Sequence, residues 1–192
     1  AKILYTIYII LTIVEIIFLL IGKMPLFDTL CLSFGTAGTG GFGIKNDSIA
    51  SYSTYNQVVI TVFMILFGIN FNAYYLLLTK KVMQAAKNEE VRYYLGIIGL
   101  AIVAIAINTR EMFTSFGRAF QQAAFQVGSI ITTTGYATTD FNVWPVFSKT
   151  ILVILMFVGA CAGSTGGGIK VSRLLILCKS ARKELQLYLH PN

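Results

Sequence analysis

Long apolar runs alternate with short polar or glycine-rich segments along the whole chain of 192 residues. The longest runs cover residues 3–21, 58–78, 93–107 and 151–162, the last resuming at 169–178. A transmembrane helix needs about 20 apolar residues, so these runs are the candidate membrane spans. Four spans with short segments between them account for nearly the whole chain and leave little room for a soluble domain.

Two amphipathic segments lie between the spans, at residues 25–34 and 113–131. The first is clearly too short to cross a hydrocarbon layer of about 30 Å. Both are therefore predicted to be re-entrant half-helices. Each is followed by a stretch rich in Gly and Thr, at residues 36–43 and 132–139.

The order of span, half-helix, polar loop and span occurs twice, which indicates an internal repeat. Placing Gly41 on Gly135 also aligns Thr39 with Thr133 and Phe42 with Tyr136. We expect an all-α membrane protein with one repeat at residues 1–80, a cytoplasmic linker at 81–92 and a second repeat at 93–192.

Composition and charge agree with a lipid environment. Hydrophobic residues make up 56% and charged residues 12% of the chain, against about 45–50% and about 25% in soluble proteins.

Most of the 15 Lys and Arg residues fall on one side of the predicted membrane topology, and that side should be cytoplasmic. They are Lys2, Lys80, Lys81, Lys87, Arg92, Lys170, Arg173, Lys179, Arg182 and Lys183. Both half-helices would then enter from outside, and because the basic residues flank apolar runs we expect no nucleic-acid partner.

Residues suited to catalysis or metal binding are scarce. Cys31, Cys161 and Cys178 are widely spaced without a CxxC motif, and His190 lies at the end of the sequence. Glu15 stands alone inside an apolar span, where either a functional carboxyl or one buried between helices fits. This pattern predicts neither an enzyme nor a cofactor in the chain.

The two Gly/Thr loops match the chemistry of a cation filter. Irregular backbone at membrane depth is tolerated only where protein buries it or where it lines a water-filled pathway. Backbone carbonyls facing one axis can replace the water around a monovalent cation, and both loops parallel the potassium-channel pattern Thr-Val-Gly-Tyr-Gly. The candidate ion-binding residues are Thr39, Gly40, Gly41, Phe42, Thr133, Thr134, Gly135 and Tyr136. Tight turns in extracellular loops are the alternative interpretation.

The last span contains a glycine-rich interruption at residues 159–168, which we call the Gly-rich loop. So many glycines predict a helix break in mid-membrane. Close helix packing through small residues is an alternative. A phosphate-binding loop does not fit, because Gly168 is followed by Ile169, Lys170 and Val171 rather than by Lys and Ser or Thr.

Residues 132–141 and 159–171 together resemble the TrkH/KtrB superfamily of potassium transporters. Residues 34–42, 68–71 and 182–185, with His190 and Pro191, are more similar to TrkH than to KtrB. The resemblance implies repeats two and three of four around a pseudo-fourfold pore, with potassium as the transported ion. It also implies a bacterial or archaeal cytoplasmic membrane, a homodimer, and a TrkA-like cytoplasmic nucleotide-binding regulatory subunit.

The resemblance further implies that the Gly-rich loop lies under the filter and gates the pore. The candidate gate residues are Gly159, Gly163, Ser164, Thr165, Gly166, Gly167, Gly168 and Lys170. Asn70 and Asn72 could line the cavity, but a hydrogen bond to a neighbouring helix is the favoured expectation. A non-conducting membrane scaffold, or a degenerate half of a transporter, is the alternative function.

Overall fold

The computed structural model describes residues 2–79, 83–84 and 88–189, and every regular element in this part of the chain is a helix. Lys80, Lys81 and Lys87 of the expected inner surface lie outside the described residues, as do His190 and Pro191. The helices are α1 (Lys2–Ile21), α2 (Leu26–Ala37), α3 (Thr54–Phe67), α4 (Phe71–Leu78), α6 (Glu89–Asn108), α7 (Phe116–Ile131), α8 (Val146–Val158) and α9 (Val171–Leu189), with short 3-10 turns η1 (Arg110–Met112) and η2 (Phe141–Val143). The predicted all-α membrane class is confirmed.

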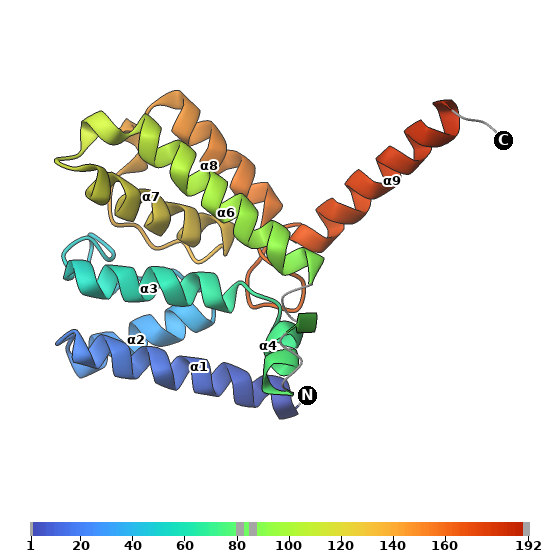
Figure 1. The fold of residues 1–192 in the computed structure, drawn as a ribbon. Coiled ribbons are helices and arrows are strands. Elements are labelled where there is room, and N and C mark those ends of the chain that lie inside the picture. The colour runs from blue at the N-terminus through green and yellow to red at the C-terminus, as the bar shows by residue number, and fades with distance from the viewer. Residues whose placement is uncertain (1, 80–82, 85–87, 190–192) are drawn as a thin grey trace.

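The helices form two stacked groups that follow the order of the chain, α1 to α3 below and α6 to α8 above (Figure 1). The lower core is built around Leu19, Leu32 and Ile60, which are fully buried. The upper core is built around Ile105 and Leu152 with their neighbours on α7. Helices α3 and α7 pack together and join the two groups.

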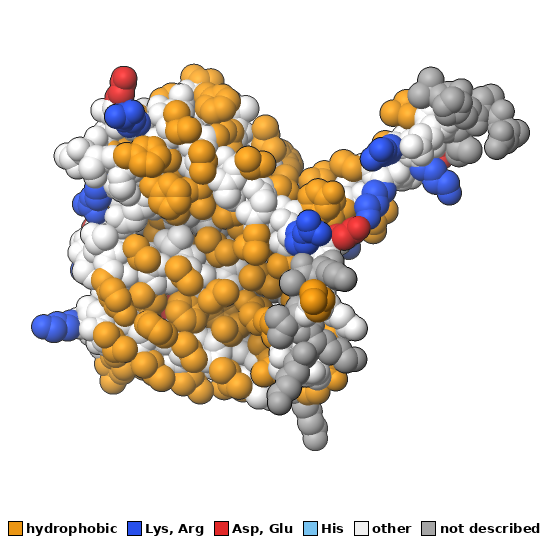
Figure 2. Space-filling model, in the orientation of Figure 1, with side chains coloured by type: hydrophobic (Ala, Val, Ile, Leu, Met, Phe, Trp, Pro, Cys, Tyr) orange, Lys and Arg blue, Asp and Glu red, His pale blue; other side chains and the backbone are white. Residues whose placement is uncertain are grey.

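Several polar side chains lie inside this bundle together with the apolar cores, and many large apolar side chains lie on its outside. Thr29, Ser33 and Ser129 are fully buried, whereas Ile9, Ile13 and Ile17 on α1 are each about half exposed. Figure 2 shows hydrophobic side chains spread over the visible face, with basic groups at the left edge and along α9 at the right. An apolar exterior with charge at two ends is the arrangement expected of a protein that has lipid around it.

Two helices of the described residues, α1 and α6, are long and apolar enough to cross a membrane. A third span exists if α3 and α4, which meet at 90°, are counted as one broken element. The short helices α2 and α7 agree with the two predicted half-helices. At 1.5 Å per residue, the 12 residues of α2 cover only about 18 Å.

The second apolar run, residues 58–78, was expected to be continuous, and the structure corrects this. The chain turns at Gly68–Asn70, where the Asn70 side chain accepts a hydrogen bond from the Asn72 N–H and starts α4. A side chain at Gly68 would place its Cβ 2.1 Å from the Tyr94 hydroxyl oxygen. The break therefore depends on Asn70, a polar capping residue within the apolar run, and on a neighbour from α6 that the pattern of this segment does not report.

The break predicted in the last span is present, since α8 ends at Val158 and α9 begins at Val171. Helix α9 extends to Leu189, well beyond the apolar run that ends at Cys178, and projects away from the bundle (Figure 1). Its Ile176, Leu177 and Leu185 are more than 60% exposed.

Candidate ion pathway

Helices α2 and α7 end with the same backbone hydrogen bonds at positions 94 residues apart. In the first, the Gly38 N–H donates to Phe34 O at 2.9 Å and the Gly40 N–H donates to Gly35 O at 2.7 Å. The matching pairs on α7 are Thr132 with Gly128 at 3.2 Å and Thr134 with Ser129 at 2.9 Å. The backbone therefore leaves α2 and α7 with the same hydrogen-bond geometry.

The two loops also share an alternation of backbone angles. Thr39 and Gly41 have positive φ, at 52° and 70°, and so do Thr133 and Gly135, at 59° and 90°. Positive φ is uncommon for residues with a side chain, so its recurrence at both threonines is informative. A loop that alternates in this way can turn neighbouring carbonyls toward one side.

The loops meet at their central glycines. A Cβ on Gly41 would lie 2.0 Å from the Thr134 carbonyl oxygen, and one on Gly135 would lie 3.9 Å from the Gly41 Cα. The structure therefore brings the predicted residues of both loops together at one point of the bundle.

The second loop is held firmly by its surroundings. The Tyr136 side chain is 1% exposed, and its hydroxyl donates to Leu32 O on α2 at 3.1 Å. The Ser129 hydroxyl donates to Tyr136 O at 2.6 Å, and Ser48 Oγ accepts from the Ala137 N–H at 3.2 Å. Phe42, which aligns with Tyr136, is instead 87% exposed.

A cavity with two carboxylates in its lining lies beside the second Gly/Thr loop. It has a volume of about 350 Å³ and is lined by both Asp47 and Asp140, from the two halves of the chain. The connection that holds Asp47 also holds Tyr52, whose hydroxyl donates to Asp28 at 2.7 Å, and burial together with this bond raises the pKa of Tyr52. Two carboxylates around one cavity attract cations and repel anions.

The Gly-rich loop packs directly against both Gly/Thr loops. The Gly167 N–H donates to Thr133 Oγ1 at 2.6 Å, and the Thr39 hydroxyl donates to Thr165 O at 3.4 Å. Its two ends close on each other, because a Cβ on Gly168 would lie 2.6 Å from the Gly159 Cα.

Lys170 is the only side chain of the predicted gate set that carries a formal charge. Its backbone has a φ of 80°, and its ammonium group donates to Gly166 O, back across the loop. The lysine is thus a structural donor that helps to fold the Gly-rich loop.

Glu90 is the residue that the sequence analysis missed. Its carboxylate on α6 accepts hydrogen bonds from the Ala162 N–H at 2.6 Å, the Ser172 N–H at 3.2 Å and Asn70 Nδ2 at 3.1 Å. Two adjacent glutamates before an apolar run indicate only a helix start, so no local signal marked this role. The bond from Asn70 confirms the expected contact with a neighbouring helix.

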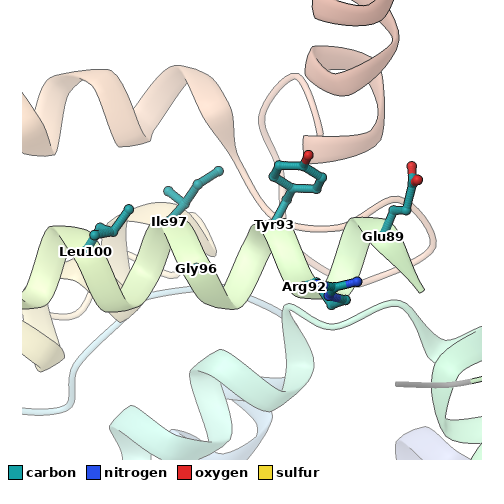
Figure 3. Close-up of a pocket in the computed structure, with 6 residues that line it drawn as sticks. All are labelled: Glu89, Arg92, Tyr93, Gly96, Ile97 and Leu100. Atoms are coloured by element: carbon teal, nitrogen blue, oxygen red, sulfur yellow. The ribbon is translucent and has the colours of Figure 1, made fainter. Parts of the chain in front are cut away.

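Two other glutamates have contrasting surroundings. Glu15 is completely buried on α1. Glu89 forms an exposed ion pair with Lys179 on α9, which raises the pKa of that lysine. A cavity of about 420 Å³ lies along the outer side of α6 (Figure 3), and its lining residues come from that helix alone. They are Glu89, Arg92, Tyr93, Gly96, Ile97 and Leu100.

Comparison with known proteins agrees with this architecture. Residues 1–192 match the family model described as "TrkH: Cation transport protein". The chain is 33% identical to the Trk system potassium uptake protein TrkH of Salmonella typhimurium and 36% identical to that of Vibrio parahaemolyticus, with all of the chain aligned in both. It spans 41% of the length of each of these relatives.

A solved structure shows the same fold. The crystal structure of the potassium transporter TrkH from Vibrio parahaemolyticus superposes with a TM-score of 0.92 at 34% identity, covering 100% of this chain and 42% of that one. These relatives are named as transport proteins and not as enzymes. The chain therefore belongs to the TrkH family of cation transport proteins.

Proposed function

We propose that this chain supplies part of a pathway for potassium uptake, in which the two Gly/Thr loops form walls of a selectivity filter. One observation carries the proposal: two loops with the same alternation of φ meet at Gly41 and Gly135. The names of the relatives, which describe potassium uptake proteins, support the choice of ion.

The chemistry of the loops suits a cation that has lost its water. Backbone carbonyls and threonine hydroxyls are neutral oxygens, so they can replace a hydration shell without trapping the ion by a fixed charge. Helices α2 and α7 both end at these loops. The negative end of a helix dipole favours cations and disfavours anions. The filter set comprises Thr39, Gly40, Gly41, Phe42, Thr133, Thr134, Gly135 and Tyr136.

Two loops line only part of an axis, so the complete filter needs further walls. The chain spans 41% of its relatives' length, and we assign the missing walls to the remaining pore repeats of a longer protein. The exposed ring of Phe42 supports this arrangement. Tyr136 packs on the half-helix of the repeat before its own, and Phe42 would do the same against a preceding repeat.

We assign the gate to the Gly-rich loop, with Gly159, Gly163, Ser164, Thr165, Gly166, Gly167, Gly168 and Lys170 as its working residues. Its hydrogen bonds to Thr133 and Thr39 place it against the filter loops. Glycine backbone at positive φ can change conformation with little steric cost. A displacement of this segment would therefore control passage of the ion between filter and cytoplasm.

The complete transporter is proposed to be a multi-pass protein of the cytoplasmic membrane and a homodimer. The basic side chains of α9 form a surface for an anionic face of a TrkA-like regulatory subunit. They are Arg173, Lys179, Arg182 and Lys183.

The test is transport by the full-length protein. Its gene should restore growth of potassium-starved cells and Rb⁺ uptake, and Gly135→Ser should lower uptake or the preference for K⁺ over Na⁺, because Gly135 has a φ of 90°. Normal uptake and selectivity in Gly135→Ser would reject the filter assignment. No rescue by the wild-type gene, despite normal membrane insertion, would favour a non-conducting scaffold.

A further inference from the structure

The Gly-rich loop is suspended between two anchors. On one side it touches the filter loops through Thr133 and Thr39. On the other side it meets the break between α3 and α4, where the Cys161 N–H donates to Gly68 O at 3.0 Å and the Phe71 N–H donates to Gly163 O at 3.2 Å. A gate of this kind needs a contact that can be made and released.

At this second anchor, one carboxylate accepts hydrogen bonds from three segments of the chain. Glu90 Oε1 accepts both the Ala162 N–H, inside the Gly-rich loop, and the Ser172 N–H, in the first turn of α9. Glu90 Oε2 accepts a hydrogen bond from Asn70 Nδ2, at the start of α4. Glu90 is thus bonded to the loop itself, to the helix that follows it and to the broken helix.

Hydrogen bonds to an ionised acceptor are roughly twice as strong as those between neutral groups. The other bonds between this side of the loop and the α3/α4 break come from neutral donors, which are backbone N–H groups and the Thr165 hydroxyl that donates to Phe67 O at 3.4 Å. Glu90 is therefore the strongest single support of the loop at this anchor. The loop itself has positive φ at Gly159, Gly163 and Gly168, so its own backbone preference resists movement very little.

We propose that Glu90 is a latch, a positioning residue that holds the Gly-rich loop in the closed state and whose three hydrogen bonds are released when the pathway opens. The proposal rests on the proposed function, because it assigns a controlling contact to that gate. It also names the moving part, since α9 is bonded to Glu90 through the Ser172 N–H. A displacement of α9 relative to α6 would pull on Glu90 through this bond.

The donor at position 70 and the acceptor at position 90 can be exchanged by mutation. In Glu90→Gln, the amide oxygen can still accept the two backbone N–H groups, but the new amide nitrogen opposes Asn70 Nδ2. In Asn70→Asp, a second carboxylate faces Glu90. The double variant Glu90→Gln/Asn70→Asp restores the pair with donor and acceptor reversed, and the new carboxylate at position 70 can still accept the Asn72 N–H.

The measurement is basal Rb⁺ flux into liposomes that contain the full-length protein, without a regulatory subunit. If the coupling free energy between the Glu90 contacts and opening of the Gly-rich loop has the usual size, each single variant should raise basal flux by about fivefold or more. The double variant should recover part of the difference, because the pair with position 70 is restored while the two backbone N–H groups keep a neutral acceptor at position 90. Glu89→Gln is the matched control, because it removes the neighbouring charge from an exposed pair and should leave basal flux unchanged.

Hydrogen–deuterium exchange of segment 159–172 provides a second readout that does not depend on transport. Exchange should rise in both single variants and fall again in the double variant. Unchanged exchange and flux in Glu90→Gln, or a double variant no better than the singles, would overturn the latch alone. Absence of Rb⁺ flux in the wild-type protein and in both single variants would overturn the proposed function and, with it, the gating role of Glu90.

Discussion

The two Gly/Thr loops have nearly the same backbone and very different surroundings. Both leave a half-helix through matching hydrogen bonds and both adopt positive φ at the same two positions. The ring of Tyr136 is buried against α2, however, whereas the ring of Phe42 is 87% exposed. Local sequence accounts for the shared backbone, and the presence or absence of a neighbouring half-helix accounts for the different burial.

The second Gly/Thr loop is supported by α2, the half-helix that precedes the first loop. The Tyr136 hydroxyl lies where a side chain at Gly35 would stand, 2.1 Å from the Cβ of such a residue. The position on α7 that matches Gly35 is Ser129, and its hydroxyl donates a hydrogen bond to Tyr136 O. Each half-helix is thus adapted to what packs on it, and among the described residues no half-helix covers the ring of Phe42 as α2 covers that of Tyr136.

The largest effect should come from the contact between the loops. Gly41→Ala would push a Cβ to 2.0 Å from Thr134 O and strain a backbone at φ 70°. Gly135→Ala meets no atom closer than 3.9 Å, so it adds only the left-handed penalty of about 1–2 kcal/mol. In Rb⁺ uptake by the full-length protein, we expect a loss of about 100-fold for Gly41→Ala and about tenfold for Gly135→Ala. Equal losses would mean that the two loops do not meet as described.

The next largest effect is expected on the free energy of unfolding when either aromatic ring, Tyr136 or Phe42, is removed. Tyr136→Ala should lower the free energy of unfolding by about 3–5 kcal/mol, because it empties a buried site. If Phe42 packs on a preceding repeat in the full-length protein, Phe42→Ala should cost a similar amount, measured by thermal unfolding in detergent. A change within about 0.5 kcal/mol, as for an exposed residue, would contradict the proposed packing. Leu100→Ala, at a position 75% exposed on α6, is the control.

The smallest effect concerns the Ser129 hydroxyl on α7, which has no counterpart at Gly35, the matching position on α2. Ser129→Ala removes the donor to Tyr136 O and should cost about 1 kcal/mol, the usual net value of one hydrogen bond. The same unfolding measurement should show a small shift with the expression of the protein unchanged. A loss as large as that of Tyr136→Ala would show that Ser129 does more than hold this carbonyl.

Much of the helical layout was predictable from the sequence. Residues 25–34 and 113–131 indicated two short helices, which correspond to α2 (Leu26–Ala37) and α7 (Phe116–Ile131). The glycines at 159–168 indicated a broken last span, and the chain does leave the helix there. These features depend on residues close together in the chain, so their composition was sufficient to predict them.

The contacts of the candidate site were less predictable. The turn at Gly68–Asn70 lies inside an apolar run in which Asn70 and Asn72 are isolated polar residues, and such residues do not by themselves mark a 90° bend. Glu90 looked like an ordinary acidic residue in a first helical turn. The partners of Glu90 lie 72 and 82 residues further along the chain and 20 residues before it. No periodicity within one segment reports a hydrogen bond over such separations.

The sequence by itself therefore determined which segments are helical, where glycine allows positive φ, and that lipid surrounds the bundle, because these follow from local backbone preference and side-chain polarity. Only the tertiary structure decided that Gly41 meets Thr134, that Tyr136 is buried while Phe42 is not, and that Glu90 holds the Gly-rich loop. Those outcomes depend on which distant groups come within a few ångströms, and such distances exist only in the folded chain.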